Sequence, residues 1–247
     1  MSLVGSAKPG LVYWLGNAVY VSLTNRARGL ALAASRGPSF SIPEHSGFAP
    51  LETEPTVADV VSAVKHAYDT DPRKENTTFK RADGLEVDPG IVFAGLGDPL
   101  LRLDTLLEAT AAIRDAGAPL SPEVKVRVST NGLVPSAASA SVAARLRDAG
   151  IDEVTVALNA ADPAAYAAFM LHAPSYPTRY FGSAAAAVGD VDGLGFGDAC
   201  AFIGALAEGG TAVTATCVAR PGVDVASVRA LSLALGASSF KERSWHP

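Results

Sequence analysis

The sequence predicts an α/β protein in which parallel strands are covered by helices. Short valine-rich apolar segments alternate with longer segments whose apolar residues recur at helical spacing. Several of the helical segments are followed by a glycine, the residue most often found just after a helix. This alternation is typical of parallel sheets with crossover helices. We expect a single domain over residues 1–247.

The first expected elements are a hairpin and a long helix. The segment LVYWLG is followed by NAVYVSLT, with a turn at Gly16-Asn17 between two apolar arms, and the second arm is the first strand of the sheet. Thr56 is a good N-cap, and Asp59 stands at the third helical position as in a capping box. The apolar face of this helix would consist of Val57, Val60, Val61, Val64 and Tyr68.

From residue 91 onward the alternation is regular. We expect strands over 91–96, 124–129, 153–158, 211–219 and 239–245, and helices over 101–116, 139–149, 198–208 and 224–235. The stretch 171–197 is expected to be an irregular insertion. Six strands and five helices of this kind fit a barrel and a doubly wound sheet equally well, so periodicity leaves that choice open.

Composition narrows the class of protein. The chain is 49% hydrophobic and 18% charged, which excludes disorder over most of its length. A net charge of −5 argues against a nucleic-acid partner. No apolar run reaches the roughly 18 residues of a membrane-spanning helix, and no secretory signal opens the sequence. The histidines have no metal-ligand spacing. We expect an intracellular protein, in the cytoplasm, with free thiols at Cys200 and Cys217.

Small and polar residues stand at the expected C-terminal end of each strand. In parallel βα architectures these ends share one face, where binding residues gather. The alternative is that loops are polar because they are solvated. The last strand ends in ERSWH at 242–246. The candidate binding residues are Gly95, Gly97, Asp98, Ser129, Asn131, Asn159 and Arg220.

Four segments carry a family resemblance. They are YWLGNAVYVSLTNR at 13–26, GLGDP at 95–99, STNG at 129–132 and VALNAADP at 156–163. In this order they resemble the radical S-adenosylmethionine (SAM) superfamily, and most closely the TatD-associated radical SAM proteins. GLGDP is similar to the family's Gly-Gly-Glu-Pro segment, which contacts the amino group of SAM. The resemblance covers nearly the whole chain and implies a partial (β/α)6 TIM-type barrel of the radical SAM type.

The same resemblance places Ala27, Ala31 and Ala34 at the positions of the family's CxxxCxxC cysteines. The family's [4Fe–4S] cluster needs three thiolates, which leave the fourth iron free to bind SAM. Alanine has no ligand atom, and Cys200 and Cys217 are expected on a helix and inside a strand. We therefore expect no iron–sulfur cluster and no radical chemistry.

Three hypotheses remain. In the first, the chain is a ligand-binding or scaffold subunit whose strand-end residues bind SAM or a nucleoside weakly. In the second, it is an enzyme, either a cysteine-to-alanine variant of an active radical SAM protein or a barrel that uses Asp98, Arg220 and Glu242 for other chemistry. In the third, it is part of a larger assembly, with 171–197 as the contact surface for a protein partner. Ala33, where the family commonly has an aromatic residue, favours natural loss of the cysteines over deliberate substitution.

Overall fold

The central feature of the computed structural model is a seven-stranded sheet. The structure describes residues 8–16, 18–70, 90–117, 120, 124–172, 176–181 and 185–247. The strands, in spatial order, are β1 (Val12–Leu15), β2 (Ala18–Val21), β4 (Ile91–Phe93), β5 (Val126–Thr130), β6 (Glu153–Ala157), β8 (Ala212–Ala219) and β9 (Ser239–Ser244). Strand β1 pairs antiparallel with β2, and every later pairing is parallel.

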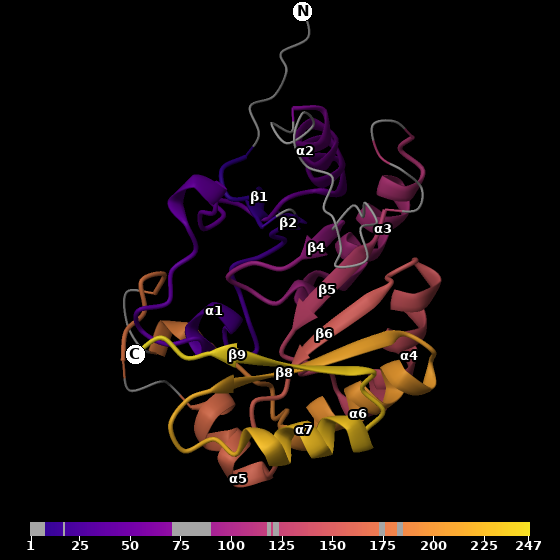
Figure 1. The fold of residues 1–247 in the computed structure, drawn as a ribbon. Coiled ribbons are helices and arrows are strands. Elements are labelled where there is room, and N and C mark those ends of the chain that lie inside the picture. The colour runs from indigo at the N-terminus through magenta and orange to yellow at the C-terminus, as the bar shows by residue number, and fades with distance from the viewer. Residues whose placement is uncertain are drawn as a thin grey trace, which may run out of the picture.

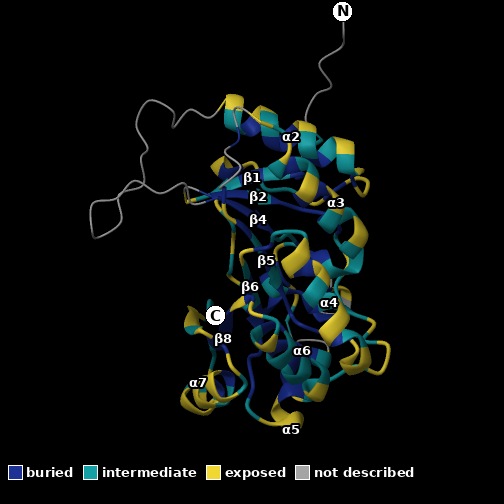
Figure 2. Ribbon diagram, turned by 90° about the vertical axis from the view of Figure 1, so that its right-hand side faces the viewer, coloured by how far each residue is buried: buried dark blue, intermediate teal, exposed yellow. Residues whose placement is uncertain are grey.

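The strand order decides between the two architectures that periodicity left open. From β2 to β9 each parallel strand lies beside the one that precedes it in the chain, whereas a doubly wound sheet reverses its order at a switch point. Right-handed crossovers then place all the connecting helices on one face. Figures 1 and 2 show these helices along one side of the curved sheet. They are α2 (Val57–Asp69), α3 (Leu103–Arg114), α4 (Ser136–Asp148), α6 (Phe196–Glu208) and α7 (Val225–Ala234). The fold is a partial barrel.

The core lies between the strands and these helices. On the strands β2, β4, β5 and β6, alternate side chains face the helices and are fully buried, for example Val19, Phe93, Val128 and Val156. Phe202 of α6 is equally buried and belongs to the same cluster. The helices themselves alternate between buried and exposed residues, as Figure 2 shows. The described residues of the core therefore form a continuous apolar layer between the sheet and the helices.

Most expected elements are present with shifted ends. The hairpin at Gly16 is confirmed, and Thr56 and Asp59 form the expected capping box. Strand β4 ends at Phe93, earlier than expected. A 3-10 turn, η3 (Pro99–Arg102), precedes α3 because the Asp98 side chain caps it. The six parallel strands and five long helices are confirmed.

Several short elements were not predicted. They are β3 (Gly29–Leu30), α1 (Leu32–Ser35), η1 (Glu44–Ser46), α5 (Pro163–Tyr166), the π-helical η4 (Ala167–Leu171), η5 (Ala185–Ala187) and β7 (Val188–Gly189). Strand β7 lies in the expected insertion and pairs antiparallel with β3. The expectation of a wholly irregular insertion was therefore wrong, because a two-residue pairing leaves no periodic pattern in the sequence. Residues 173–175 and 182–184 of the insertion lie outside the described part.

The end of the last strand is joined to the first βα loop by what we call the closing contact, between residues 36–39 and 244–246. The amide of His246 donates to the carbonyl of Arg36 at 2.8 Å, and the amide of Ser39 donates to the carbonyl of His246 at 3.3 Å. The Nε of Arg36 donates to the carbonyl of Ser244 at 3.0 Å. Figure 1 shows the C-terminus beside α1. The contact joins the first βα loop to the last strand.

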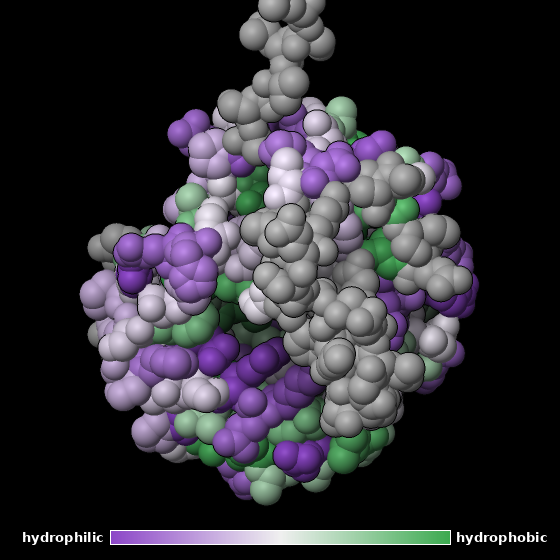
Figure 3. Space-filling view, turned by 45° about the horizontal axis from the view of Figure 1, so that its top comes forward, coloured by the Kyte–Doolittle hydropathy of each residue, from purple (hydrophilic) through white to green (hydrophobic). Residues whose placement is uncertain are grey.

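The surface is mixed in character. On the face that Figure 3 shows, hydrophilic residues form a band across the lower half. Within the described ranges, no helix is both long and apolar enough to cross a membrane.

Candidate functional site

A cavity of about 360 Å³ lies inside the curve of the sheet, and we call it the lumen cavity. Its walls come from inward-facing strand residues and from the first βα loop with α1. The strand residues alternate with the buried ones that face the helices. They include Tyr20, Ala94, Ser129, Ala157, Thr216 and Arg243. The cavity is thus lined largely by small and hydroxyl-bearing side chains.

Three of the seven predicted site residues, Gly95, Ser129 and Asn159, line the lumen cavity. Asn159 is fully buried with a φ of 60°, a conformation that asparagine tolerates better than most residues. Its Oδ1 accepts from the amide of Val218 at 2.9 Å, and its Nδ2 lies 3.1 Å from Sδ of Met170. Asn159 therefore shapes the cavity while its polar atoms are bound within the protein.

Asp98 lies outside the described cavities. Its Oδ2 accepts from the hydroxyl of Thr130 at 2.7 Å and from the amide of Asn131 at 3.0 Å. Its Oδ1 accepts from the amide of Leu100 at 2.9 Å. Burial raises the pKa of this carboxyl, against the lowering effect of these hydrogen bonds. The carboxyl joins the end of β4 to the end of β5, which is a structural role.

Gly97 and Asn131 hold the loop that follows β2. The amide of Gly97 donates to the carbonyl of Thr24 at 3.1 Å. The Nδ2 of Asn131 donates to the carbonyl of Arg28, and its Oδ1 accepts from the amide of Leu133 at 3.2 Å. Neither residue lines a described cavity. Their polar groups are used within the protein.

Arg220 belongs to a different surface. It lines a groove of about 700 Å³ between α5, η4 and the start of α7, which we call the outer groove. Its guanidinium carbon lies 4.4 Å from the ring centre of Phe169 and 5.6 Å from that of Trp245. None of Asp98, Arg220 and Glu242 lines the lumen cavity. The structure does not assemble these three residues into one site.

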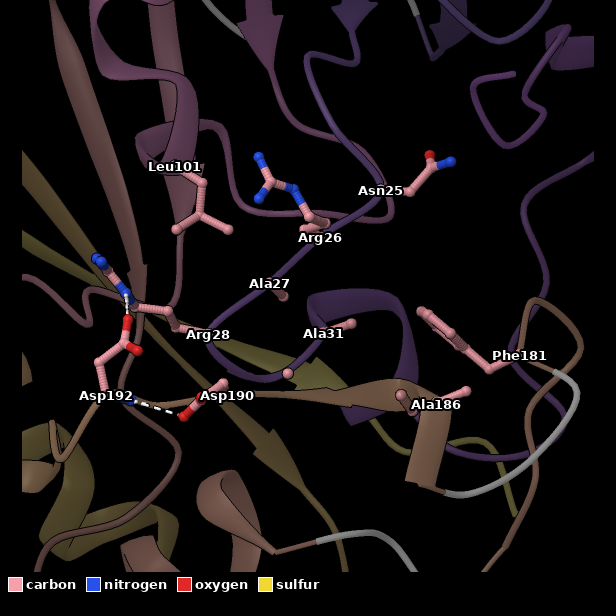
Figure 4. A pocket seen from close by; sticks show the side chains of 12 residues that line it. Asn25, Arg26, Ala27, Arg28, Ala31, Leu101, Phe181, Ala186, Asp190 and Asp192 are labelled. Carbon is pink, nitrogen blue, oxygen red and sulfur yellow. Dashed lines mark hydrogen bonds and ion pairs between the residues drawn. The ribbon is translucent and has the colours of Figure 1, made fainter. Parts of the chain in front are cut away.

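The three alanines are divided between two environments. Ala27 and Ala31 line a cavity of about 450 Å³, which we call the loop cavity, whereas Ala34 is fully buried in the core. Figure 4 shows Phe181 and Ala186 of the insertion across from Ala31. The amide of Ala31 donates to the carbonyl of Ala187 at 2.9 Å. The insertion thus covers the segment in which the resemblance places the cysteines.

An ion pair fastens the insertion to this loop. The Nε of Arg28 lies 3.1 Å from Oδ2 of Asp192, as the dashed line in Figure 4 shows. Arg28 also donates to the carbonyl of Leu133 at 3.3 Å. Arg26 extends from the same loop but is paired with Glu54 at 3.2 Å.

The chain does not fit a [4Fe–4S] cluster with three thiolate ligands. It contains two cysteines, Cys200 on α6 and Cys217 on β8. Burial raises the pKa of Cys200 to about 11 and is the main reason that the pKa of Cys217 is raised to about 12, so both thiols are neutral at pH 7. In the part of the chain that the structure describes, no three His, Cys, Asp or Glu residues are grouped for a metal ion.

Solved structures with this architecture identify the fold. The chain aligns with SuiB from Streptococcus suis bound to S-adenosylmethionine at a TM-score of 0.56 and 10% identity, covering 94% of this chain and 40% of SuiB. It aligns with HydG, a maturase of the [FeFe]-hydrogenase, at a TM-score of 0.52 and 13% identity, covering 93% of this chain and 42% of HydG. Methylornithine synthase (PylB) aligns at a TM-score of 0.51 and 12% identity, covering 93% of this chain and 53% of PylB. All three are radical SAM enzymes. The chain has the radical SAM fold.

The similarity is one of fold and covers part of those proteins. The chain spans about two-fifths to one half of the length of these radical SAM enzymes. No protein-family model and no curated protein sequence matches it.

The two charged residues of the lumen cavity, Arg36 and Arg243, were absent from the predicted site. Arg243 stands at the end of the last strand, a position that the strand-end rule indicates. Arg36 follows α1, a helix too short to leave a pattern in the sequence. Only the fold brings both to one cavity.

Proposed function

We propose that this chain is a radical-SAM-fold protein that binds a small nucleoside-type ligand in the lumen cavity and carries out no radical chemistry. The observation that carries the proposal is a lumen cavity of about 360 Å³, with several polar side chains in a largely apolar lining, in a chain that has two cysteines. The resemblance to TatD-associated proteins and the assignment of residues 1–247 to one domain remain sequence-based parts of this proposal.

Small residues on β5, β6 and β8 and just after β4 help to leave room for a ligand in the lumen. In complete barrels the interior is filled by bulky branched side chains. Here Ala94, Ser129, Ala157 and Thr216 occupy inward positions, and a cavity of about 360 Å³ remains. Ligand pockets are commonly of about 300–1,000 Å³. The hydroxyls of Ser129 and Thr216 offer hydrogen bonds to a ribose or base.

A nucleoside is the favoured ligand class because SuiB, which shares the fold, is bound to S-adenosylmethionine in its structure. In cluster-bearing relatives the iron without a thiolate ligand chelates SAM, and this chain lacks the three cysteines that would hold the cluster containing that iron. Asp98 accepts hydrogen bonds from Thr130, Asn131 and Leu100, so an amine of the ligand would compete with them. SAM should therefore bind weakly, with no advantage over S-adenosylhomocysteine.

Calorimetry tests this proposal with SAM, S-adenosylhomocysteine and 5′-deoxyadenosine. Ser129→Leu fills the lumen and should weaken binding of each ligand by at least about tenfold, since the added side chain occupies ligand space. Ser141→Leu makes the same exchange at an exposed position of α4 and should leave affinity unchanged. Absence of binding at millimolar concentration, or equal binding by Ser129→Leu, contradicts the proposal.

The scaffold hypothesis has less support. Among its described residues, the insertion packs on its own chain: β7 pairs with β3, and Tyr176 packs edge-to-face against Trp245 with ring centres 5.5 Å apart. These contacts leave less of the insertion available to a protein partner. The genomic coding sequence at positions 27, 31 and 34 distinguishes natural loss of the cysteines from deliberate substitution.

A further inference from the structure

The lumen cavity has an unusual distribution of charge. Its lining includes two arginines, Arg36 and Arg243, and among the described residues that line it there is no Asp, Glu or Lys. The chain as a whole carries a net charge of −5. A positive cavity in an acidic protein attracts anions and raises their local concentration. The charge therefore bears on which ligand the cavity takes.

Arg36 is held in place by the closing contact. Its Nε donates to the carbonyl of Ser244 at 3.0 Å, and a terminal nitrogen lies 3.3 Å from Nε2 of His246. Its guanidinium carbon lies 4.7 Å from the ring centre of Phe40. None of these partners is a carboxylate, and they use only part of the N–H donors of the guanidinium. A positioned arginine with spare donors is suited to bind an anion.

Arg243 approaches the same cavity from β9. The residue is exposed, and its side chain forms no ion pair or hydrogen bond within the described part of the chain. The pKa of Arg36 is lowered by burial and, to a smaller extent, by the charge of Arg243. Two like charges near one cavity repel each other, and an anion between them would relieve that repulsion.

We propose that the lumen cavity takes a ligand bearing a phosphate or carboxylate group, and that this group binds between Arg36 and Arg243. The inference rests on the proposed function and names the chemistry of its ligand. The remainder of the ligand would lie against Ser129, Ala157 and Thr216, deeper in the lumen. An acidic nucleotide or nucleoside derivative fits this arrangement.

Calorimetry with three related compounds tests the inference. Adenosine 5′-monophosphate offers a phosphate, S-adenosylhomocysteine a carboxylate, and 5′-deoxyadenosine neither. At least one acidic compound should bind about tenfold or more tightly than 5′-deoxyadenosine, because charge-assisted bidentate hydrogen bonds are strong. The acidic compound that binds more tightly than 5′-deoxyadenosine shows whether the cavity prefers a phosphate or a carboxylate. Equal affinities for all three overturn the inference and leave the proposed function standing.

Matched variants assign the effect to Arg243. Arg243→Gln should abolish the advantage of the acidic compound and leave 5′-deoxyadenosine unaffected. Lys241→Gln makes the same change in charge on the same strand, outside the cavity lining, and should alter affinity by less than about twofold through screened long-range effects. An unchanged advantage in Arg243→Gln would overturn the proposed site.

Thermal unfolding in inorganic phosphate tests the anion site independently of any nucleoside. Phosphate should raise the Tm of the wild type and of Lys241→Gln more than that of Arg243→Gln. Arg243→Glu places a carboxylate near Arg36, and should raise the Tm without phosphate while removing the response to it. An equal phosphate response in every variant overturns the inference. A specific response without nucleoside binding supports the anion site and contradicts the nucleoside proposal.

Discussion

The two glycines after β4 illustrate how a residue can be correctly singled out for the wrong reason. Gly95 and Gly97 were predicted to be binding residues, and a glycine at such a position can let a ligand approach the backbone closely. A Cβ on Gly97 would lie 2.3 Å from the carbonyl oxygen of Arg26 and 2.5 Å from that of Thr24. A Cβ on Gly95 would lie 2.6 Å from Oγ of Ser22. The close approach at Gly97 is to the protein's own backbone.

We expect Gly97→Ala to destabilise the protein markedly. The added methyl group would overlap backbone atoms that cannot rotate away, so we expect a loss of about 1–3 kcal/mol in the free energy of unfolding. Urea denaturation measures this loss. Gly197→Ala is the control, because a Cβ at that exposed position of α6 meets no atom within 4 Å. A Gly97→Ala protein as stable as Gly197→Ala would contradict this packing role.

The candidate site could be only partly predicted because polarity does not reveal a side chain's partner. Asp98 and Asn131 have the residue types of a binding site, yet their hydrogen bonds are internal. Arg220 was predicted to be a binding residue, and its guanidinium lies over the ring of Phe169. Ser129 was placed in the lumen because strand alternation fixes its direction.

At the level of elements, the sequence was most informative where a helix or strand has a local signal. The cap at Thr56 and the hairpin at Gly16 both depend on neighbouring residues and were predicted. Helix α5 was missed although Asp162 caps it and Pro163 occupies its first turn, a recognised start signal. It is too short to show periodicity. The pairing of β3 with β7 depends on residues far apart in the chain.

The capping box of α2 yields a prediction about pH. Hydrogen bonds from Lys8 and from Thr56 lower the pKa of Asp59 to about 2 from its ordinary 3.8. The stabilisation is therefore fully present above the ordinary pKa and is lost as the pH falls through about 2. Asp59→Asn should lower the free energy of unfolding at neutral pH, and the difference from wild type should shrink on acidification. Denaturation curves of both proteins at successive pH values measure this difference in the free energy of unfolding.

Thr56→Ala should lower the free energy of unfolding by about 1 kcal/mol at neutral pH, because it removes the side-chain acceptor for the amide of Asp59. Thr53→Ala makes the same exchange at an exposed residue before the helix and should leave the free energy of unfolding unchanged. A Thr56→Ala protein no less stable than Thr53→Ala would show that α2 does not depend on its cap.

At the level of the whole molecule, hydrophobic periodicity could not choose between a barrel and a doubly wound sheet. Both contain the same buried strands and amphipathic helices, and they differ only in which strands are neighbours. The resemblance at residues 13–26, 95–99, 129–132 and 156–163 favoured the barrel, and the strand order agrees. The closure of the lumen by Arg36 and His246 has no local sequence signal.

The whole chain should fail to acquire an iron–sulfur cluster. After anaerobic reconstitution with iron and sulfide we expect no broad absorption near ~400 nm, because three thiolate ligands are required and the sequence has two cysteines. Iron and sulfide analysis provides a second measurement. Recovery of about four irons per chain would refute this expectation.

The closing contact has a consequence for the rate of folding. It joins residues that stand 208 positions apart, whereas each βα unit forms from neighbouring segments. Contacts between residues so far apart in the chain form slowly because of loop-closure entropy. We therefore expect the closing contact to form late in folding and to open first in native fluctuations. A ligand that bridges Arg36 and Arg243 would then lengthen the lifetime of the native state while leaving the folding rate unchanged.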